Sequence, residues 1–356
     1  MPKVMVAFYN TNQIGGPNIA MNKLIHSYLK DKYEFVPIII NDKLGKIFRI
    51  KVLKRLTNEI KNEKPDVIYF SGLQLHGFYI ALAAKLAGYS NRTIMVVRGT
   101  STDAIQASKY FKFLFGRLIE PATCRMTQIT HTVCTRMASH RIIENNVSHF
   151  GGVIYNAAPI INCVFDKQDF RREIHADTKD VILVYSGRLK EEKGIGILLN
   201  AMKNQRSNIK LVLVGDGMLE YFKGISHELG LDEQVFFLGK RNDVFRVLSG
   251  ADIFVYPTFY ENLSNALLEA CAVGLPAIVS NVGGNPEVVR NEIDGFTVPP
   301  KDVKKLANAI ERLASDEQLR KTMGFNAKAR METVFSQNQL FKKIDNLFEQ
   351  IINIGD

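Results

Sequence analysis

Short apolar runs alternate along the chain with longer stretches in which apolar residues recur every three or four positions. The runs are typical of strands buried in a parallel sheet, and the spaced apolar residues are typical of helices that cover it. In the first half, the predicted strands are Val4–Phe8, Phe35–Ile39, Val67–Phe70, Thr93–Val97, Ile129–Cys134 and Val153–Tyr155. Helices are predicted between them, near residues 18–30, 46–62, 77–87, 104–118 and 135–145. This alternation predicts βαβ units that build a doubly wound parallel sheet.

The second half repeats this order of elements. Its predicted strands are Val181–Tyr185, Lys210–Val214, Val235–Leu238, Ile253–Tyr256, Ala277–Val279 and Phe296–Val298. Its predicted helices lie near residues 195–203, 218–229, 243–249, 263–273, 302–314 and 316–330. Asn162–Lys179 is polar and lacks apolar periodicity, so it is predicted as the linker. The fold class is therefore α/β, with two doubly wound Rossmann-like domains facing a cleft.

A last amphipathic stretch lies beyond these units. In Gln337–Ile352, apolar residues share one helical face, namely Leu340, Ile344, Leu347, Phe348 and Ile351. Because this helix follows the last strand of the second domain, we expect it to pack back on the first domain. The predicted division is residues 1–165, residues 166–335 and a C-terminal helix at 336–356.

Composition places the chain among ordinary globular proteins. Its 356 residues suggest two domains, and the hydrophobic content is 46%. No apolar run reaches the ~20 residues of a membrane span. The start, MPKVMVAFYN, enters a predicted strand without the features of a signal peptide, and the four cysteines have no disulfide-like spacing. We expect a cytoplasmic protein.

The charge is distributed unevenly. Residues 1–168 contain 22 Lys and Arg against 10 Asp and Glu, whereas residues 169–356 contain 24 against 26. A basic first half predicts an anionic partner, either an acidic membrane or a nucleic acid. Lys43–Lys64 and Ser108–Leu118 interleave cations with apolar residues, as interfacial segments do. The alternative is that Ile47, Leu53 and Phe113 pack on the sheet and the lysines are merely solvated.

The most informative stretch is Phe259–Pro276, FYENLSNALLEACAVGLP. Glu261 is predicted in a strand-to-helix loop, at the sheet edge where α/β proteins bind ligands. Glu269 follows two helical turns later. Carboxylates so placed suit the vicinal hydroxyls of a sugar or a ribose. The alternative is a helix cap at Glu261 and a solvated side chain at Glu269.

Glycine-rich turns follow several predicted strands. Ser186–Gly194, SGRLKEEKG, combines two cations and a helix start, which suits a diphosphate, although an ordinary loop with solvated lysines would look alike. Val214–Met218, Asn281–Val289 and Asn10–Pro17 are weaker signals of the same type. We find no GxGxxG, Walker A, HExxH or metal-spaced cluster and no Asp-x-Asp, so we expect neither a metal nor a cofactor.

Taken together, these segments resemble one family. GRLKEEKG, LVLVGDG, VFFLGKRNDV, the stretch from Ala251 to Val289 and DGFTVPPKD are similar to the donor domain of family 4 retaining glycosyltransferases of the GT-B fold. The resemblance is continuous over about Val181–Asp302. The first half is less similar, mainly through IGGPNIAMNKL, PDVIYFSG and VIYNAAP. It implies a nucleotide-sugar donor domain at 166–335 and an acceptor-binding, membrane-facing domain at 1–165.

The resemblance also implies roles for single residues. Arg188 and Lys193 would bind the donor diphosphate, Glu261 the transferred sugar and Glu269 the ribose. The remaining donor-binding residues would be Gly15, Gly16, Gly187, Gly239, Lys240, Arg241, Asn262, Leu263 and Ser264. The implied catalytic residues are thus Arg188, Lys193 and Glu261. Transfer would retain the anomeric configuration through same-face attack, without a metal.

Two positions depart from the family pattern. Asn262 stands where the family usually has glycine, and asparagine tolerates the left-handed backbone that such a loop can require. Arg98 stands where the family often has histidine; it could contact a phosphate or an acidic acceptor but cannot act as a base. A structural loop-end role for Arg98 stays open. His76 is a weaker candidate for the same contact.

The prediction is therefore a retaining glycosyltransferase on the inner face of the membrane. It would move a sugar from a nucleotide-sugar donor, a UDP-sugar rather than a GDP-sugar, to a lipid-linked saccharide of bacterial lipopolysaccharide, O-antigen or capsule. One alternative is a nucleotide-sugar epimerase of GT-B-like fold, which should need paired acid and base carboxylates. The other is a basic nucleic-acid-binding protein, for which no recognition motif is evident.

Overall fold

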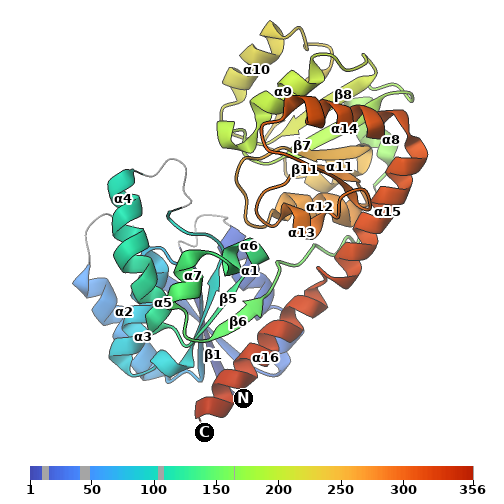
Figure 1. Ribbon diagram of the computed structural model, residues 1–356. Helices are drawn as coiled ribbons and strands as arrows, with labels where there is room; N and C mark the ends of the chain where they lie inside the picture. Colours follow the sequence, from blue (N-terminus) through green and yellow to red (C-terminus); the bar gives the residue numbers. More distant parts are fainter. Residues whose placement is uncertain (10–15, 41–48, 103–107, 164, 356) are drawn as a thin grey trace. The chain divides into compact units, whose positions relative to one another are not determined.

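The computed structural model describes residues 1–9, 16–40, 49–102, 108–163 and 165–355. The chain forms two compact units (Figure 1). Unit 1 comprises Met1–Asn156 and Asn338–Asp356, and unit 2 comprises Ala157–Gln337. The predicted boundary at 165/166 thus lies inside unit 2.

Unit 1 is built on a six-stranded parallel sheet, which has the order β2-β1-β3-β4-β5-β6. Its strands are β1 Lys3–Tyr9, β2 Glu34–Ile40, β3 Val67–Ser71, β4 Thr93–Val97, β5 Ile129–Thr132 and β6 Phe150–Val153. Its helices are α1 Gly16–Ile25, α2 Ile50–Glu63, α3 Leu75–Ala87, α4 Lys109–Leu114, α5 Glu120–Met126, α6 Thr135–Ala138, α7 Arg141–Asn146 and α16 Gln337–Gly355. The strand predicted at Val153–Tyr155 is displaced to β6, because Gly151 and Gly152 inside β6 carry no side chain to show the pattern.

The two basic segments of unit 1 differ in what they do with their apolar side chains. Residues 41–48 of Lys43–Lys64 lie outside the described residues. On α2, Leu53, Leu56 and Ile60 are buried in the core of unit 1. The predicted membrane contact is therefore wrong for these three side chains, because the core of unit 1 covers them, whereas Ile50 at the start of α2 is 71% exposed.

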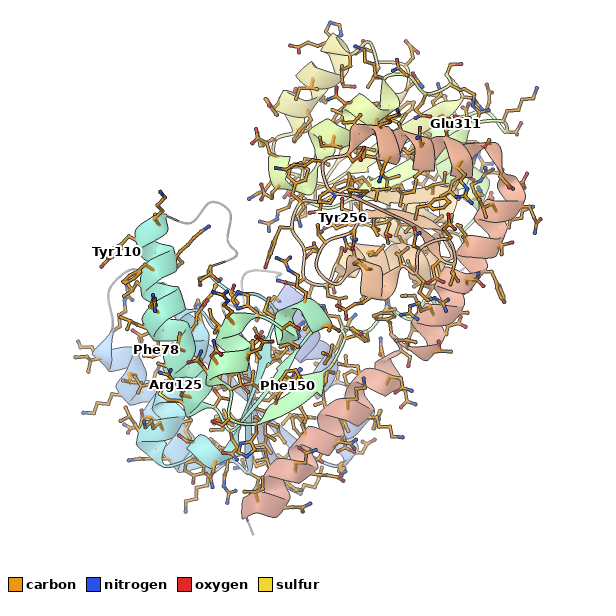
Figure 2. All side chains as sticks on the ribbon, viewed as in Figure 1. Phe78, Tyr110, Arg125, Phe150, Tyr256 and Glu311 are labelled. Atoms are coloured by element: carbon orange, nitrogen blue, oxygen red, sulfur yellow. The ribbon has the colours of Figure 1, made fainter. Side chains whose placement is uncertain are left out.

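The second basic segment exposes its apolar side chains. α4 continues through a π-helical turn, Phe115–Ile119, into α5. Tyr110 is 76% exposed, Phe113 63% and Leu118 58%, and Tyr110 is labelled on α4 in Figure 2. Phe113 does not pack on the sheet, so the packing alternative is wrong at this residue.

The C-terminal helix α16 belongs to unit 1. Phe348 is buried and packs edge-on against the rings of Tyr33 and Tyr69. The Tyr33 hydroxyl donates to Asp345 Oδ1 at 2.6 Å, and Lys32 pairs with Asp345 at 2.8 Å. An apolar face and an ion pair thus hold the last helix on the first unit.

Unit 2 also has six parallel strands, in the order β12-β11-β10-β7-β8-β9. They are β7 Val181–Ser186, β8 Ile209–Val214, β9 Val235–Gly239, β10 Ile253–Tyr256, β11 Ala277–Ser280 and β12 Gly295–Val298. The helices are α8 Lys167–Glu173, α9 Ile195–Met202, α10 Leu219–Glu228, α11 Val244–Gly250, α12 Asn265–Val273, α13 Asn285–Val288, α14 Val303–Ser315 and α15 Glu317–Thr333. The two parallel sheets confirm the predicted α/β class.

The predicted linker at Asn162–Lys179 is wrong, because it contains α8. Phe170 is fully buried and fills the space over Gly250, where an added Cβ would lie 2.6 Å from the Phe170 ring. Arg171 is also buried and donates to Asp252 Oδ2 at 3.0 Å. One aromatic anchor and one buried cation hold this short helix, so it carries no apolar periodicity.

None of the helices in the described part of the chain is both long and apolar enough to cross a bilayer.

Candidate active site

The strand order of unit 2 creates a switch point between β7 and β10. Connections leave these neighbouring strands in opposite directions along the sheet, and in open α/β sheets ligands bind at the carboxyl ends beside such a point. The loop after β7 carries Arg188 and Lys193, and the loop after β10 carries Glu261. The topology thus brings the three predicted catalytic residues to one sheet edge.

Glycine permits the close approach of these two loops. Gly194 has a φ of +73°, and a Cβ there would lie 2.0 Å from the carbonyl oxygen of Pro257. The Phe259 amide also donates to the Glu192 carbonyl at 2.8 Å. Any other residue at position 194 would push Lys193 away from the β10 loop.

Lys193, Glu261 and Tyr256 form one hydrogen-bonded cluster. Lys193 Nζ lies 3.0 Å from Glu261 Oε2, and the Tyr256 hydroxyl donates to the same oxygen at 2.7 Å. Lys193 also reaches the Tyr256 hydroxyl at 3.3 Å. The side chains of Lys193 and Glu261 are each 19% exposed, so their charges are partly shielded from water. Burial and the charge of Glu261 raise the pKa of Tyr256 well above its usual range, so the hydroxyl stays a neutral donor.

A second tyrosine supports the first. The rings of Tyr185 and Tyr256 stack at 5.7 Å, and the Tyr185 hydroxyl donates to the Arg188 carbonyl at 3.0 Å. The Arg188 side chain itself is exposed and forms no ion pair within the described residues. Sequence reasoning treated both tyrosines as strand residues only. The signal that it missed is a polar-tipped aromatic near the carboxyl end of each strand beside the switch point.

The loop after β10 is held in place before α12 begins. Asn262, Leu263 and Ser264 are buried, and the Ser264 hydroxyl caps α12 by accepting from the Leu267 amide at 3.3 Å. The Asn262 carbonyl accepts from the Gly284 amide at 2.6 Å. Asn262 does not have the positive φ that glycine would offer, so asparagine causes no backbone strain here. Glu269 lies half-buried on α12.

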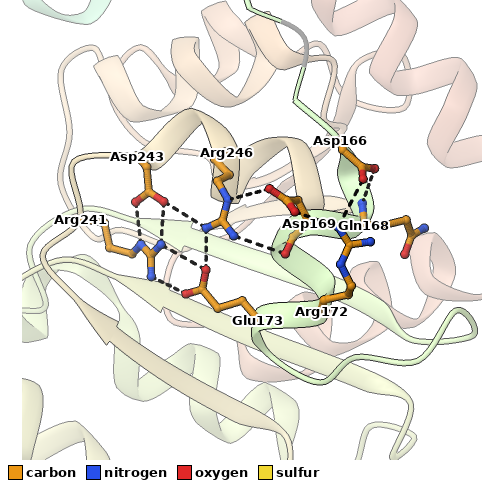
Figure 3. Close-up of polar contacts among 8 residues, drawn as sticks. All are labelled: Asp166, Gln168, Asp169, Arg172, Glu173, Arg241, Asp243 and Arg246. Carbon is orange, nitrogen blue, oxygen red and sulfur yellow. Dashed lines mark hydrogen bonds and ion pairs between the residues drawn. The ribbon is translucent and has the colours of Figure 1, made fainter.

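Just after β9, the Arg241 side chain forms ion pairs within unit 2. Gly239 has a φ of +64° and Lys240 is exposed. The Arg241 guanidinium bonds Asp243 Oδ1 at 2.7 Å and Glu173 Oε1 at 2.6 Å, and Arg246 reaches the other Glu173 oxygen at 2.5 Å (Figure 3). This cluster ties α8 to the β9–α11 connection. The Arg241 side chain therefore has a structural role, and this holds regardless of what the backbone of Gly239–Arg241 contacts.

The two guanidinium groups also change the acidity of the cluster. Hydrogen bonds from Arg241 and then Arg246 lower the pKa of Glu173. The hydrogen bond from Arg241 lowers the pKa of Asp243 strongly. Both carboxyls are therefore charged at neutral pH, as an ion-pair cluster requires.

The candidate residues of unit 1 lie at the carboxyl edge of its own sheet. Gly15 lies outside the described residues, and Gly16 begins α1. His76 is half-buried on α3, beside the Tyr9 ring at 5.0 Å, and burial lowers its pKa. Arg98 follows β4 and donates to Asn156 Oδ1.

A buried histidine that the sequence did not single out lies near Arg98. His131 Nε2 lies 3.0 Å from the Tyr69 hydroxyl, and burial and the Arg98 charge lower the pKa of His131 to about 3. It is therefore neutral at any physiological pH. Within the residues that the structure describes, no group of His, Cys, Asp and Glu could hold a metal ion.

Comparisons with known proteins show what the chain is similar to. Residues 166–330 match the family model described as glycosyl transferases group 1. The chain is 28% identical over 343 residues to an Escherichia coli UDP-Gal:alpha-D-GlcNAc-diphosphoundecaprenol alpha-1,3-galactosyltransferase, covering 92% of this chain and 86% of that protein. It is 26% identical to the capsular polysaccharide biosynthesis glycosyltransferase CapM of Staphylococcus aureus, covering 85% and 81%.

A further relative, an uncharacterized glycosyltransferase of Methanocaldococcus jannaschii, is 35% identical over 52% of this chain. The match spans only about half of that relative, 48% of its length. Among solved structures, HepE of Anabaena in complex with UDP has a TM-score of 0.78 at 18% identity, covering 98% of this chain and 100% of that one. Sucrose-phosphate synthase of Thermosynechococcus elongatus has a TM-score of 0.76 at 19% identity, covering 99% and 100%. At these identities the structures establish the fold, which is that of GT-B glycosyltransferases.

Proposed function

We propose that this protein is a glycosyltransferase that moves a sugar from a nucleotide-sugar donor to a lipid-linked saccharide, since residues 166–330 match the family model described as glycosyl transferases group 1. The acceptor is a precursor of bacterial lipopolysaccharide, O-antigen or capsule. The observation that carries this proposal is the cluster of Lys193, Glu261 and Tyr256 at the switch point of unit 2. It offers a cation for a diphosphate and a carboxylate for hydroxyls at one edge of one sheet.

The donor bond breaks more easily when the charge that develops on the leaving group is stabilised. Breaking a sugar–diphosphate bond develops negative charge on the nucleotide diphosphate, and fixed cations beside it lower the barrier. Arg188 is exposed and has no ion-pair partner within the described residues, so it can turn to a phosphate without breaking a contact. Lys193 must exchange its pairing with Glu261 for the phosphate.

When Lys193 leaves Glu261 for the phosphate, Glu261 becomes able to contact the sugar. When the diphosphate takes the ammonium group of Lys193, Glu261 keeps the hydrogen bond from Tyr256 and is free to accept from sugar hydroxyls. The backbone amides of Asn262, Leu263 and Ser264 stand beside it, next to the start of α12. Glu269 on the same helix holds the ribose. Binding of a nucleotide sugar therefore replaces one internal ion pair with two contacts to the donor.

Several finer points of the proposal rest on the family resemblance. They are retention of anomeric configuration, independence from metal ions and preference for UDP over GDP. The anomeric proton of the product, observed by NMR, tests retention. Addition of a chelator tests the metal, and competition between UDP and GDP tests the base.

The acceptor side of the proposal draws on relatives and on charge. The names of the Escherichia coli relative and of a Campylobacter jejuni relative, 30% identical over 186 residues, both specify a lipid diphosphate acceptor. Unit 1 holds most of the basic excess, and α4 exposes aromatic residues beside Lys109 and Lys112. Docking of this surface on the anionic inner face of the membrane brings the protein to such an acceptor.

One experiment tests the donor part. The purified protein is incubated with a panel of UDP-, GDP- and other nucleotide sugars, with and without chelator, while nucleotide diphosphate release and thermal stabilisation are measured. One donor should stabilise the protein and be cleaved, with no effect of chelator, and Glu269→Ala should abolish both effects. If no donor stabilises the protein, the proposed function is wrong.

A further inference from the structure

Unit 1 contains a hollow that the donor chemistry does not use. It has a volume of about 700 Å³ and lies between the helix of α4 with its π-helical turn on one side and the α6–α7 segment on the other. Such a volume is within the range of ligand sites, about 300–1,000 Å³. Figure 1 shows α4 and α5 in line, with α7 beside α5.

Cations dominate the polar lining of this hollow. Lys112 and Arg117 come from the α4 side, and Arg141 comes from α7. None of these three forms an ion pair or a side-chain hydrogen bond within the described residues, and no described lining residue is acidic. Arg136 adds a fourth cation to the wall.

Several cations elsewhere in unit 1 are paired. Lys32 pairs with Asp345 and Glu349, Arg92 pairs with Asp66, and Arg55 pairs with Glu59. Like charges that converge without a counter-charge repel one another. Their accumulation around a hollow therefore indicates an anion that arrives from outside.

The same hollow has an apolar side. Phe113 and Ile142 line it, and Phe113 is 63% exposed. Tyr110 and Leu118, on the same helix, are also exposed, so the apolar surface continues beyond the hollow. Exposed apolar patches of this kind mark binding surfaces.

The backbone of this wall is unusual. The π-helical turn Phe115–Ile119 interrupts the helix where it borders the hollow, and π-helical turns occur frequently at functional sites. Gly116 in this turn faces Thr102, where an added Cβ would lie 2.5 Å from Thr102 Cγ2. The turn thus lets the helix approach Thr102, in the connection after β4, while Phe113 and Arg117 line the hollow.

We propose that this hollow binds the diphosphate and the first isoprenoid units of the lipid-linked acceptor. Arg117 and Arg141 hold the phosphate oxygens, since guanidinium groups pair with phosphate in two-point contacts. Phe113 and Ile142 cover the start of the hydrocarbon chain. The inference rests on the proposed function, because it assigns the acceptor subsite of the same reaction.

The test uses farnesyl diphosphate, a short and water-soluble prenyl diphosphate, and calorimetric titration of the full-length protein. The double variant Arg117→Gln/Arg141→Gln should bind it about 10- to 100-fold more weakly, since each substitution removes a charge-assisted contact. Farnesol, which lacks the phosphates, and inorganic pyrophosphate, which lacks the chain, should each bind at least about tenfold more weakly to the unaltered protein. Arg117→Lys, which keeps the positive charge, should retain part of the affinity that the substitution by Gln removes.

Arg125→Gln is the matched control, because Arg125 is an exposed cation of α5 that does not line the hollow. It should leave the affinity unchanged. Stabilisation by the nucleotide sugar should be the same in all variants, which also shows that they are folded.

Two results would overturn the inference. One is equal binding of farnesyl diphosphate to the unaltered protein and the double variant, or no binding to either. The other is a double variant that binds anionic phosphatidylglycerol vesicles more weakly than the unaltered protein but binds farnesyl diphosphate equally well. That result would assign these cations to the bilayer surface. Failure of the proposed function looks different, because no nucleotide sugar would then stabilise the unaltered protein, whatever farnesyl diphosphate does.

Discussion

The Lys193 cluster of unit 2 and the hollow of unit 1 hold their cations differently. In unit 2, Lys193 pairs with Glu261, and Arg241 pairs with Glu173 and Asp243. In unit 1, Lys112, Arg117 and Arg141 surround a hollow without ion-pair partners among the described residues. An anionic ligand that binds a paired cation must first replace the carboxylate that the cation already contacts. Converging cations without partners attract an anion at long range and lose that attraction as salt rises.

The same contrast separates two basic helices within unit 1. Both α2 and α4 interleave cations with apolar residues in the sequence. α2 buries Leu53, Leu56 and Ile60 in the core, whereas α4 leaves Tyr110 and Phe113 exposed. An amphipathic pattern thus shows that a helix has an apolar face, but not whether protein or lipid covers it.

The largest expected effect comes from removing a buried apolar side chain of α2. Leu56→Ala should lower the free energy of unfolding by about 2–5 kcal/mol, because Leu56 is fully buried and the cavity cannot close. Phe113→Ala should change it by less than about 0.5 kcal/mol, because Phe113 is exposed. Urea unfolding of both variants checks this. A large loss in Phe113→Ala would show that α4 packs on protein.

Removing the paired cation of unit 2 should have the next largest effect. Lys193→Ala should lower the rate of nucleotide diphosphate release by about 10²–10³-fold, because the leaving group loses a preorganised charge. Lys190→Ala, on the same loop, is the control and should stay within about twofold, since Lys190 pairs only loosely with Glu192 at 3.6 Å. Equal activities of the two variants would remove Lys193 from the mechanism.

Tyr256→Phe tests the support of the same pair. It removes one hydrogen bond to a carboxylate, so we expect kcat to fall about 10- to 100-fold. The donor KM should change less, because Lys193 and Glu261 remain. Tyr221→Phe, an exposed tyrosine of α10, is the control. A change in stability without a change in kcat would make Tyr256 purely structural.

Acid should produce the smallest effect. The folded-state pKa of Glu173 is lowered, so its pairing stabilises unit 2 fully above the unfolded-state pKa of about 4.3 and is lost as pH falls through the folded-state value. The loss should be about 0.2–1 kcal/mol, because the carboxylate is 34% exposed. Glu173→Gln should remove this part of the acid limb in thermal unfolding between pH 6 and pH 3. An unchanged acid limb would contradict the pairing.

Much of the fold follows from periodicity, and much of the site does not. Thr93–Val97 and Ile253–Tyr256 are strands with the predicted bounds, because long apolar runs in a parallel sheet leave little ambiguity. α8 could not be predicted, since it depends on Phe170 meeting Gly250, a contact between distant positions. Arg241 was expected to bind the donor, but no sequence pattern could show that Glu173 pairs with its side chain.

The candidate site divides in the same way. Sequence motifs identified Lys193 and Glu261, and the strand order brings them together. Motifs did not identify Tyr256 and Tyr185, because a tyrosine in an apolar run is indistinguishable from any other buried aromatic residue. The hollow lined by Arg117 and Arg141 was also missed, since those residues are separated in sequence and meet only through the packing of α5 and α7.

The most direct measurement is sugar transfer itself. The protein is incubated with a nucleotide sugar labelled in its sugar and with membranes or extracted lipid-linked saccharide, and the label in the organic phase is counted. The account predicts label in the organic phase together with released nucleotide diphosphate, and the loss of both in Glu261→Gln. A donor that is consumed without diphosphate release, with the label recovered in an epimeric nucleotide sugar, would contradict it.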